Sequence, residues 1–267
     1  MYRGFKLNIN NNIFKSLTVT KPELKDSIFE SLKDYNYYHK RGEEMFDKYA
    51  FDVYDNLELY IKGDSGIIDG TKLQNDWFPQ INCDIFISHS HKDEDLAIAL
   101  AGWLYDRFQL KSFIDSCIWH YADDLLEIID NKYCLSSDHS YNYRSRNYST
   151  SHVHMMLNMA LMQMIDKTEC LFFLNTPNSI DLSDIKTRTL SPWIYSEIGI
   201  SKMINKHIKR TSIFSKLDES LGISYNLDLS HLANISQQNL KSWGQQNIYG
   251  NDSLDWLYET IKAPLKQ

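Results

Sequence analysis

The spacing of hydrophobic positions changes several times between residues 84 and 175. Ile85, Phe86 and Ile87 form a continuous apolar run, which is typical of a buried parallel strand. From Leu96 to Phe108 apolar residues recur every three or four positions, which predicts a helix. Strands are also expected at SFID (112–115), CLFFLN (170–175) and TSIF (211–214). This alternation predicts an α/β fold with a doubly wound, mostly parallel sheet.

Helical periodicity also appears on both sides of this region. Apolar residues between Lys21 and Ile61 have helical spacing, and Pro22 with Glu23 suits a first helical turn. We therefore assign residues 1–80 to an N-terminal helical extension and residues 81–267 to the main domain. Further helices are predicted at DDLLEIIDNKY (123–133), HVHMMLNMALMQMI (152–165), SPWIYSEIGIS (191–201) and DSLDWLYETIK (252–262).

A polar stretch, SSDHSYNYRSRNYSTS (136–151), separates two of these helices. It is longer than most connections in compact domains and predicts a loop. Its arginines and tyrosines resemble a nucleic-acid patch, but two arginines in an acidic chain favour a solvated loop. The methionines of the helix that follows are predicted to fill the core. Their positions are 155, 156, 159, 162 and 164.

The helix that begins near residue 191 contains one misplaced charge. Ser191 suits the N-cap, and Pro192 suits the first helical position. Trp193 and the isoleucines at 194, 198, 200 and 204 gather on one broad arc, which predicts packing on a core. Glu197 falls inside this arc, where a carboxylate is unexpected.

Polar residues follow the first two predicted strands, and in doubly wound sheets ligands bind beyond the carboxyl ends of the strands. Ser88 and His89 could bind ribose or phosphate there, or cap the next helix, a role for which Ser90 is the stronger candidate. Asp115 could bind a ribose hydroxyl or form a turn. Trp119 could stack on a base or lie at a protein contact. We expect these residues and Glu197 to lie near one edge of the sheet.

Composition narrows the class of function. The net charge is −7 and the pI is about 5.7, with no long run of Lys or Arg, which argues against nucleic-acid and anionic-membrane partners. No signal peptide and no run of 18 apolar residues is found, so we expect a cytoplasmic protein. The four cysteines are scattered and are predicted to be free thiols.

Several common types of site are also disfavoured by the sequence. The pairs His89/His91 and His152/His154 lack a partner cluster, so no metal site is expected. The motifs of dinucleotide-binding dehydrogenases, P-loop NTPases and serine hydrolases are absent from the sequence. Dehydrogenase, P-loop NTPase and serine hydrolase functions are therefore disfavoured.

Four segments in order, at 84–104, 111–125, 170–175 and 191–198, resemble the Toll/interleukin-1 receptor (TIR) domain family, including its S-x-W-x-x-x-E segment. The chain looks more like the bacterial anti-phage members, such as Thoeris-type proteins, than like receptor adaptors. The resemblance covers about half of the chain and implies a flavodoxin-like sheet. The extension before residue 81 and an insertion at 131–151 depart from the family pattern.

The resemblance implies an NAD nucleosidase or ADP-ribosyl cyclase, with NAD as substrate and no cofactor. Glu197 would be catalytic. Phe86, Ser88, His89, Asp115, Trp119 and Trp193 would bind substrate. An ADP-ribose-derived product would act on a downstream effector, after a phage-derived trigger and homo-oligomerisation through TIR contacts. The alternatives are a non-catalytic TIR assembly module and, more distantly, an enzyme resembling nucleoside deoxyribosyltransferases.

Overall fold

The computed structural model forms two compact units, and each is considered by itself. The first unit comprises residues 1–48, 82–114 and 165–267, and the second comprises residues 49–81 and 115–164. The residues whose structure is described are 3–17, 33–49, 57–61, 67–119, 122–136, 140–180, 188–204, 225–262 and 264.

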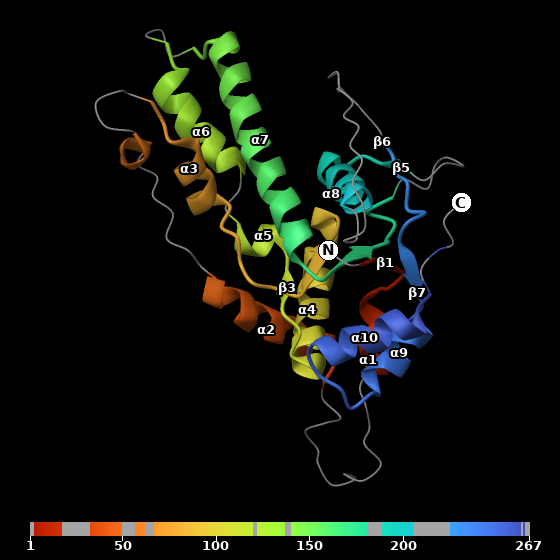
Figure 1. Cartoon of the computed structure of the whole chain (residues 1–267). Helices are drawn as coiled ribbons and strands as arrows, with labels where there is room; N and C mark the ends of the chain where they lie inside the picture. The colour runs from red at the N-terminus through yellow and green to blue at the C-terminus, as the bar shows by residue number, and fades with distance from the viewer. Residues whose placement is uncertain are drawn as a thin grey trace. The chain divides into compact units, whose positions relative to one another are not determined.

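The first unit contains a parallel sheet of five strands (Figure 1). Its order is β3-β2-β4-β1-β7, and every neighbouring pair is parallel. The strands are β1 (Arg3–Leu7), β2 (Ile85–Ser88), β3 (Ser112–Phe113), β4 (Cys170–Leu174) and β7 (Ala233–Ile235). The prediction of an α/β fold with a parallel sheet is therefore confirmed.

Six α-helices and a small second sheet accompany the five-stranded sheet in the described part of this unit. The helices are α1 (Phe14–Leu17), α2 (Tyr35–Phe46), α4 (Glu94–Phe108), α8 (Pro192–Met203), α9 (Gln237–Gly244) and α10 (Asn251–Thr260). The small sheet pairs β5 (Arg188–Thr189) with β6 (Tyr225–Asn226) in antiparallel fashion. None of the described helices is both long enough and apolar enough to cross a membrane.

The strand β1 corrects the sequence prediction for the N-terminal segment, in which only helices were expected. β1 lies inside the sheet, where Phe5 is opposite Phe172 of β4 and opposite Ala233 of β7. The short sequence RGFKL has no distinctive pattern, and its role depends on partners far along the chain. The strand predicted at 211–214 lies outside the described residues.

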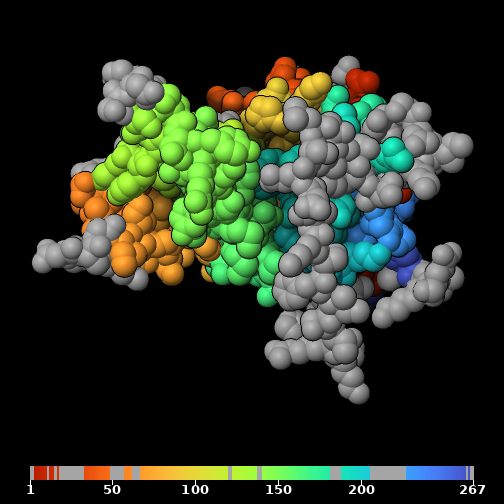
Figure 2. Space-filling model, turned by 90° about the horizontal axis from the view of Figure 1, so that it is seen from above, coloured from red at the N-terminus to blue at the C-terminus, as the bar shows by residue number. Residues whose placement is uncertain are grey.

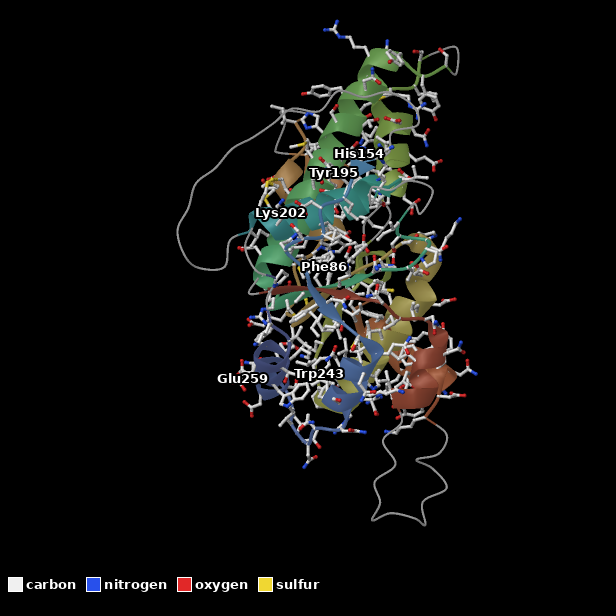
Figure 3. All side chains as sticks on the ribbon, turned by 90° about the vertical axis from the view of Figure 1, so that its right-hand side faces the viewer. Phe86, His154, Tyr195, Lys202, Trp243 and Glu259 are labelled. Atoms are coloured by element: carbon white, nitrogen blue, oxygen red, sulfur yellow. The ribbon has the colours of Figure 1, made fainter. Side chains whose placement is uncertain are left out.

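Helices cover both faces of the sheet in the first unit. In Figure 3, α8 with Tyr195 and Lys202 lies on one side of the strands, and α9 and α10 with Trp243 and Glu259 lie on the other. On the second side, the Trp243 ring stacks on Phe108 at 4.3 Å between centroids. The ring of Phe172 also reaches Trp243, at 6.2 Å, so the C-terminal helices are part of the main core.

The helices α2 and α4 cross at unusually close range. A Cβ atom added to Gly102 would lie 1.9 Å from the Tyr38 carbonyl oxygen, and one added to Gly42 would lie 2.2 Å from the Ile98 carbonyl oxygen. Real Cβ atoms do not approach backbone oxygens this closely. The two glycines therefore allow the backbones to touch at the crossing.

The second unit is helical in its described part. It contains α3 (Gly70–Trp77), α5 (Asp115–Ile118), α6 (Ala122–Tyr133) and most of α7 (Tyr143–Lys167). The long helix α7 corrects the loop predicted at 136–151, because residues from 143 onward are helical. Asn142 caps it by accepting from the Ser145 N–H at 3.0 Å. Asn142, one of the polar residues that indicated a loop, is therefore the N-cap of this helix.

The methionines of α7 also correct a prediction. Met164 is buried, but Met155, Met159 and Met162 are 61%, 43% and 40% exposed. At about 100° per residue, Met155, Met159 and Met162 lie within about 60° of one another, on the side of α7 opposite Met164. The prediction that all of them fill the core was wrong.

A buried carboxylate joins α6 to α7. Asp130 accepts hydrogen bonds from Arg146 Nε at 2.8 Å, from the Ser149 hydroxyl and from the Cys134 thiol at 3.3 Å. Burial by itself would raise the pKa of Asp130, but the hydrogen bonds from Ser149, Arg146 and Cys134 outweigh it and hold the pKa below its usual value. The folded state therefore favours the ionised carboxylate.

Replacing Asp130 with asparagine is expected to lower the free energy of unfolding at pH 7 by about 2–3 kcal/mol. Because the pKa is depressed in the folded state, this stabilisation is complete above the unfolded pKa of about 3.9 and is lost as the pH falls below it. Urea unfolding at pH 7 and pH 3 should therefore show a smaller difference between wild type and variant at pH 3. Asp124→Asn, an exposed change on the same helix, is the control. An equal effect of the two substitutions at pH 7 would contradict the assignment.

Candidate functional site

The order of the strands creates one natural position for a ligand. From β2 the chain first adds β3 on one side and later adds β4 on the other, so the direction of winding reverses between β2 and β4. Ligands of doubly wound sheets bind beyond the carboxyl ends of the strands at such a switch point. The residues that follow β2 and β4 are therefore the first candidates.

Polar atoms without hydrogen-bond partners lie at this position. Ser88 ends β2 with 1% of its surface exposed, and its Oγ has no partner among the described residues. The same holds for His89 Nε2 and for Oδ1 of Asn175, the first residue after β4. Buried polar atoms are nearly always paired, so three such atoms around one switch point indicate a site for an external donor or acceptor.

The loops after β2 and β4 are tied together by a second carboxylate. Asp93, 8% exposed, accepts from the Thr176 hydroxyl and from Asn178 Nδ2, the latter at 2.7 Å. These bonds explain why the Asp93 side chain does not cap α4, although Asp93 stands at its N-cap position. Ser90 makes no side-chain cap bond either, so its expected capping role is not observed. Asp93 instead fixes the two loops that border the switch point.

A row of asparagines continues along the same edge of the sheet. Asn175 Nδ2 donates to Asn8 Oδ1, and Asn8 Nδ2 donates to Asn234 Oδ1 at 2.7 Å. These residues belong to β4, β1 and β7 or follow them directly, so the row crosses three neighbouring strands. Its amides hold the side chain of Asn175 at the switch point, with Oδ1 as its remaining acceptor.

The helix α8 begins as the sequence predicts. The Ser191 side chain accepts from the Ile194 N–H at 3.3 Å, and Pro192 is the first helical residue. Ile194, Ile198 and Ile200 are buried. Glu197 is only 3% exposed, which confirms that the buried face of this helix contains a carboxylate. Such a placement requires a specific reason, because a charge is costly to remove from water.

The far end of α8 is anchored to the segment before β7. Lys202 forms an ion pair with Asp228, and the Ser201 hydroxyl lies 2.9 Å from His231 Nε2. Hydrogen bonds from Lys202 and from Ser230 hold the pKa of Asp228 well below its usual range. With a cap at one end and these contacts at the other, α8 is a rigid support for Glu197.

The other predicted site residues divide between the two units. In the first unit, Phe86 is fully buried, with its ring 5.2 Å from that of Phe113, and Trp193 is partly exposed at the start of α8. Asp115 and Trp119 belong to the second unit. Trp119 is 6% exposed, and its Nε1 donates to the Pro79 carbonyl at 2.9 Å, so its indole is part of the core of that unit.

The described residues contain no group of three or more His, Cys, Asp or Glu side chains arranged to hold a metal ion. The thiols of Cys83, Cys134 and Cys170 are free, as the sequence predicts. Burial raises the pKa of the Cys83 thiol to about 12, so it is protonated at neutral pH. A Cys83 thiol in this state is a poor nucleophile.

Comparisons of the chain with protein-family models, with curated proteins and with solved structures gave no match. The function therefore has to be argued from the site itself. The sequence had indicated Ser88, His89 and Glu197, and it missed Asp93, Asn175, Thr176 and Asn178. A signal for the last three was present, because the buried run CLFFL leads directly into the polar turn NTPNS.

Proposed function

We propose that this chain is a TIR-like enzyme that cleaves the bond between nicotinamide and ribose in NAD. Glu197 would be the catalytic carboxylate. The observation that carries the proposal is the burial of Glu197 on a capped and anchored helix. The switch point in the same compact unit, with its buried and unpartnered Ser88, His89 and Asn175 atoms, supports it.

The chemistry requires little from the protein beyond one well-placed negative charge. Nicotinamide leaves NAD as a neutral molecule, so no general acid is needed for its departure. Positive charge develops on the ribose, as in glycoside hydrolysis, and a carboxylate beside it stabilises that charge. Water then completes the reaction to ADP-ribose and a proton, whereas attack by a group of the ADP-ribose itself gives a cyclic product.

The proposed substrate contacts follow from the donors and acceptors at the sheet edge. Ser88, His89 and Asn175 would meet ribose hydroxyls or phosphate oxygens, and Trp193 would border the ribose beside Glu197. Binding by Phe86, Asp115 and Trp119 stays a prediction from the resemblance. The wider role, an ADP-ribose-derived signal in bacterial anti-phage defence made by an assembled homo-oligomer, also rests on the resemblance.

Replacing Glu197 with glutamine is expected to reduce NAD consumption at least about 100-fold, because the substitution removes the charge and keeps the shape. The measurement is nicotinamide release from purified protein at high concentration, with and without phage lysate as trigger. Glu259→Gln removes an equal charge from an exposed position on α10 and should leave the rate unchanged (Figure 3). Mass spectrometry of the product distinguishes ADP-ribose from a cyclic isomer.

Two outcomes would overturn this assignment. Equal rates for wild type and Glu197→Gln would show that Glu197 is not the catalytic residue. No NAD consumption by the assembled and triggered wild type would favour the non-catalytic assembly module. A parallel assay with deoxynucleosides tests the deoxyribosyltransferase-like alternative, which predicts release of free base in place of nicotinamide.

A further inference from the structure

The second unit contains a hollow that the proposed NAD chemistry does not use. Its volume is about 800 Å³, and its described lining comes from α3, α6, α7, the residues just before α3 and the residue just after α6. Figure 2 shows two of these elements, α3 in orange and α7 in green, side by side on one face of the unit. Volumes of this order are typical of sites for small organic molecules.

The lining combines buried apolar residues with exposed aromatic and basic ones. Leu73 and Ile129 are buried, and Met156 is partly exposed. Tyr148 and His152 are exposed, and their rings meet edge to face at 4.4 Å between centroids. The apolar part of a small molecule could therefore pack on the buried residues, away from water. Its polar group would then lie beside the exposed residues.

The charge of the lining indicates which kind of polar group a bound molecule would carry. Arg144 is the one Lys or Arg in the described lining, which contains no Asp or Glu. Arg146, two residues along, is paired with Asp130 at 2.8 Å, whereas Arg144 makes no ion pair among the described residues. In a chain with a net charge of −7, the described lining of this hollow therefore carries one positive charge that no described ion pair neutralises.

We propose that the second unit binds a small organic anion with an apolar body. The body would lie on Leu73, Ile129 and Met156, and a carboxylate, sulfonate or phosphate group would pair with the Arg144 guanidinium. Tyr148 and His152 would flank the entrance. This inference does not depend on the proposed NAD activity, since all of these residues belong to the second unit.

The test uses two fluorescent probes with the same ring system, anilinonaphthalene sulfonate and its uncharged analogue phenylnaphthylamine, titrated into the full-length chain. Met156→Trp fills the hollow and should weaken binding of both probes at least about tenfold. Met155→Trp adds the same indole to an exposed position outside the lining and should change neither affinity. Equal binding of both probes to Met156→Trp and wild type would overturn the proposed site.

A second variant tests the charge and does not depend on whether Met156→Trp folds. Arg144 is exposed, and Arg144→Ala should weaken the sulfonate about fivefold, the effect of one partly solvated ion pair, while the uncharged probe is unaffected. Arg41→Ala removes an equal charge from the first unit, where Arg41 pairs with Glu44 at 3.1 Å, and should affect neither probe. Unchanged sulfonate affinity in Arg144→Ala, or an equal loss for both probes, would overturn the proposed anion recognition.

Discussion

Replacing Gly102 with alanine is expected to lower the free energy of unfolding by about 3–4 kcal/mol. The added methyl carbon would lie 1.9 Å from the Tyr38 carbonyl oxygen and 2.7 Å from the Gly42 nitrogen. Neither atom can move away alone, because both belong to the backbone of α2. The helices must separate along their crossing, and this loss exceeds the gain of about 1 kcal/mol that alanine gives a helix interior.

Thermal unfolding followed by circular dichroism measures this effect. For a chain of this size the expected decrease in melting temperature is roughly 10 °C. Gly199→Ala is the matched control, because Gly199 is also helical and a Cβ there meets no atom within 4 Å. That change should raise stability slightly. Equal melting temperatures for Gly102→Ala and Gly199→Ala would show that the crossing is looser than described.

Replacing Trp243 with alanine is expected to cost about 3–5 kcal/mol, the range for removing a large aromatic ring from a core. Trp243 is fully buried, stacks on Phe108 and lies edge-on to Trp103 at 5.7 Å between centroids. Its indole N–H also donates to the Ser253 carbonyl oxygen at 2.9 Å. The substitution therefore opens a cavity and removes the link between α9 and α10.

Two further variants separate these contributions in urea unfolding. Trp243→Phe keeps an aromatic ring and loses the N–H donor, so it should cost roughly half as much as alanine. Trp256→Ala removes the same residue type from a partly exposed position on α10 and should cost about 1 kcal/mol. If the alanine variants at 243 and 256 are equally stable, Trp243 does not organise this core.

The sequence indicated the elements whose patterns are local. The apolar runs at 85–87 and 170–175, the helical spacing of α4 and the Ser191–Pro192 start of α8 each depend on neighbours a few residues away. β1 and α7 could not be predicted in this way. The pairing of β1 depends on residues more than 160 positions distant, such as the register of Arg3 with Cys170. The first turns of α7 contain the polar residues Arg146 and Ser149. Their side chains donate hydrogen bonds to Asp130 on α6, where a solvated loop would donate to water.

The candidate site was predictable only in part, for the same reason. Ser88 and His89 follow a recognisable strand, and Glu197 interrupts a recognisable apolar arc. Asn8 and Asn234 contact each other across 226 residues, and no local pattern marks either of them. Asp93 has the pattern of a helix cap, but its carboxylate bonds to the loop after β4. Only the tertiary structure shows that the Asp93 carboxylate bonds to this loop and not to the N–H groups at the start of α4.

The position of β1 has a consequence for how the protein is made. β1 is made before its neighbours β4 and β7, whose paired residues lie more than 160 positions later in the chain. The hydrogen bonds of the Arg3 guanidinium form later still, because their acceptors are the carbonyl oxygens of Tyr258 and Ile261, at 2.9 and 2.7 Å. Until β4 leaves the exit tunnel, β1 has no neighbouring strand, and the side chains that the sheet buries are exposed to water. The centre of the sheet therefore cannot form until β4 has been made, and a chaperone that binds the β1 segment in the meantime would improve the yield of native protein.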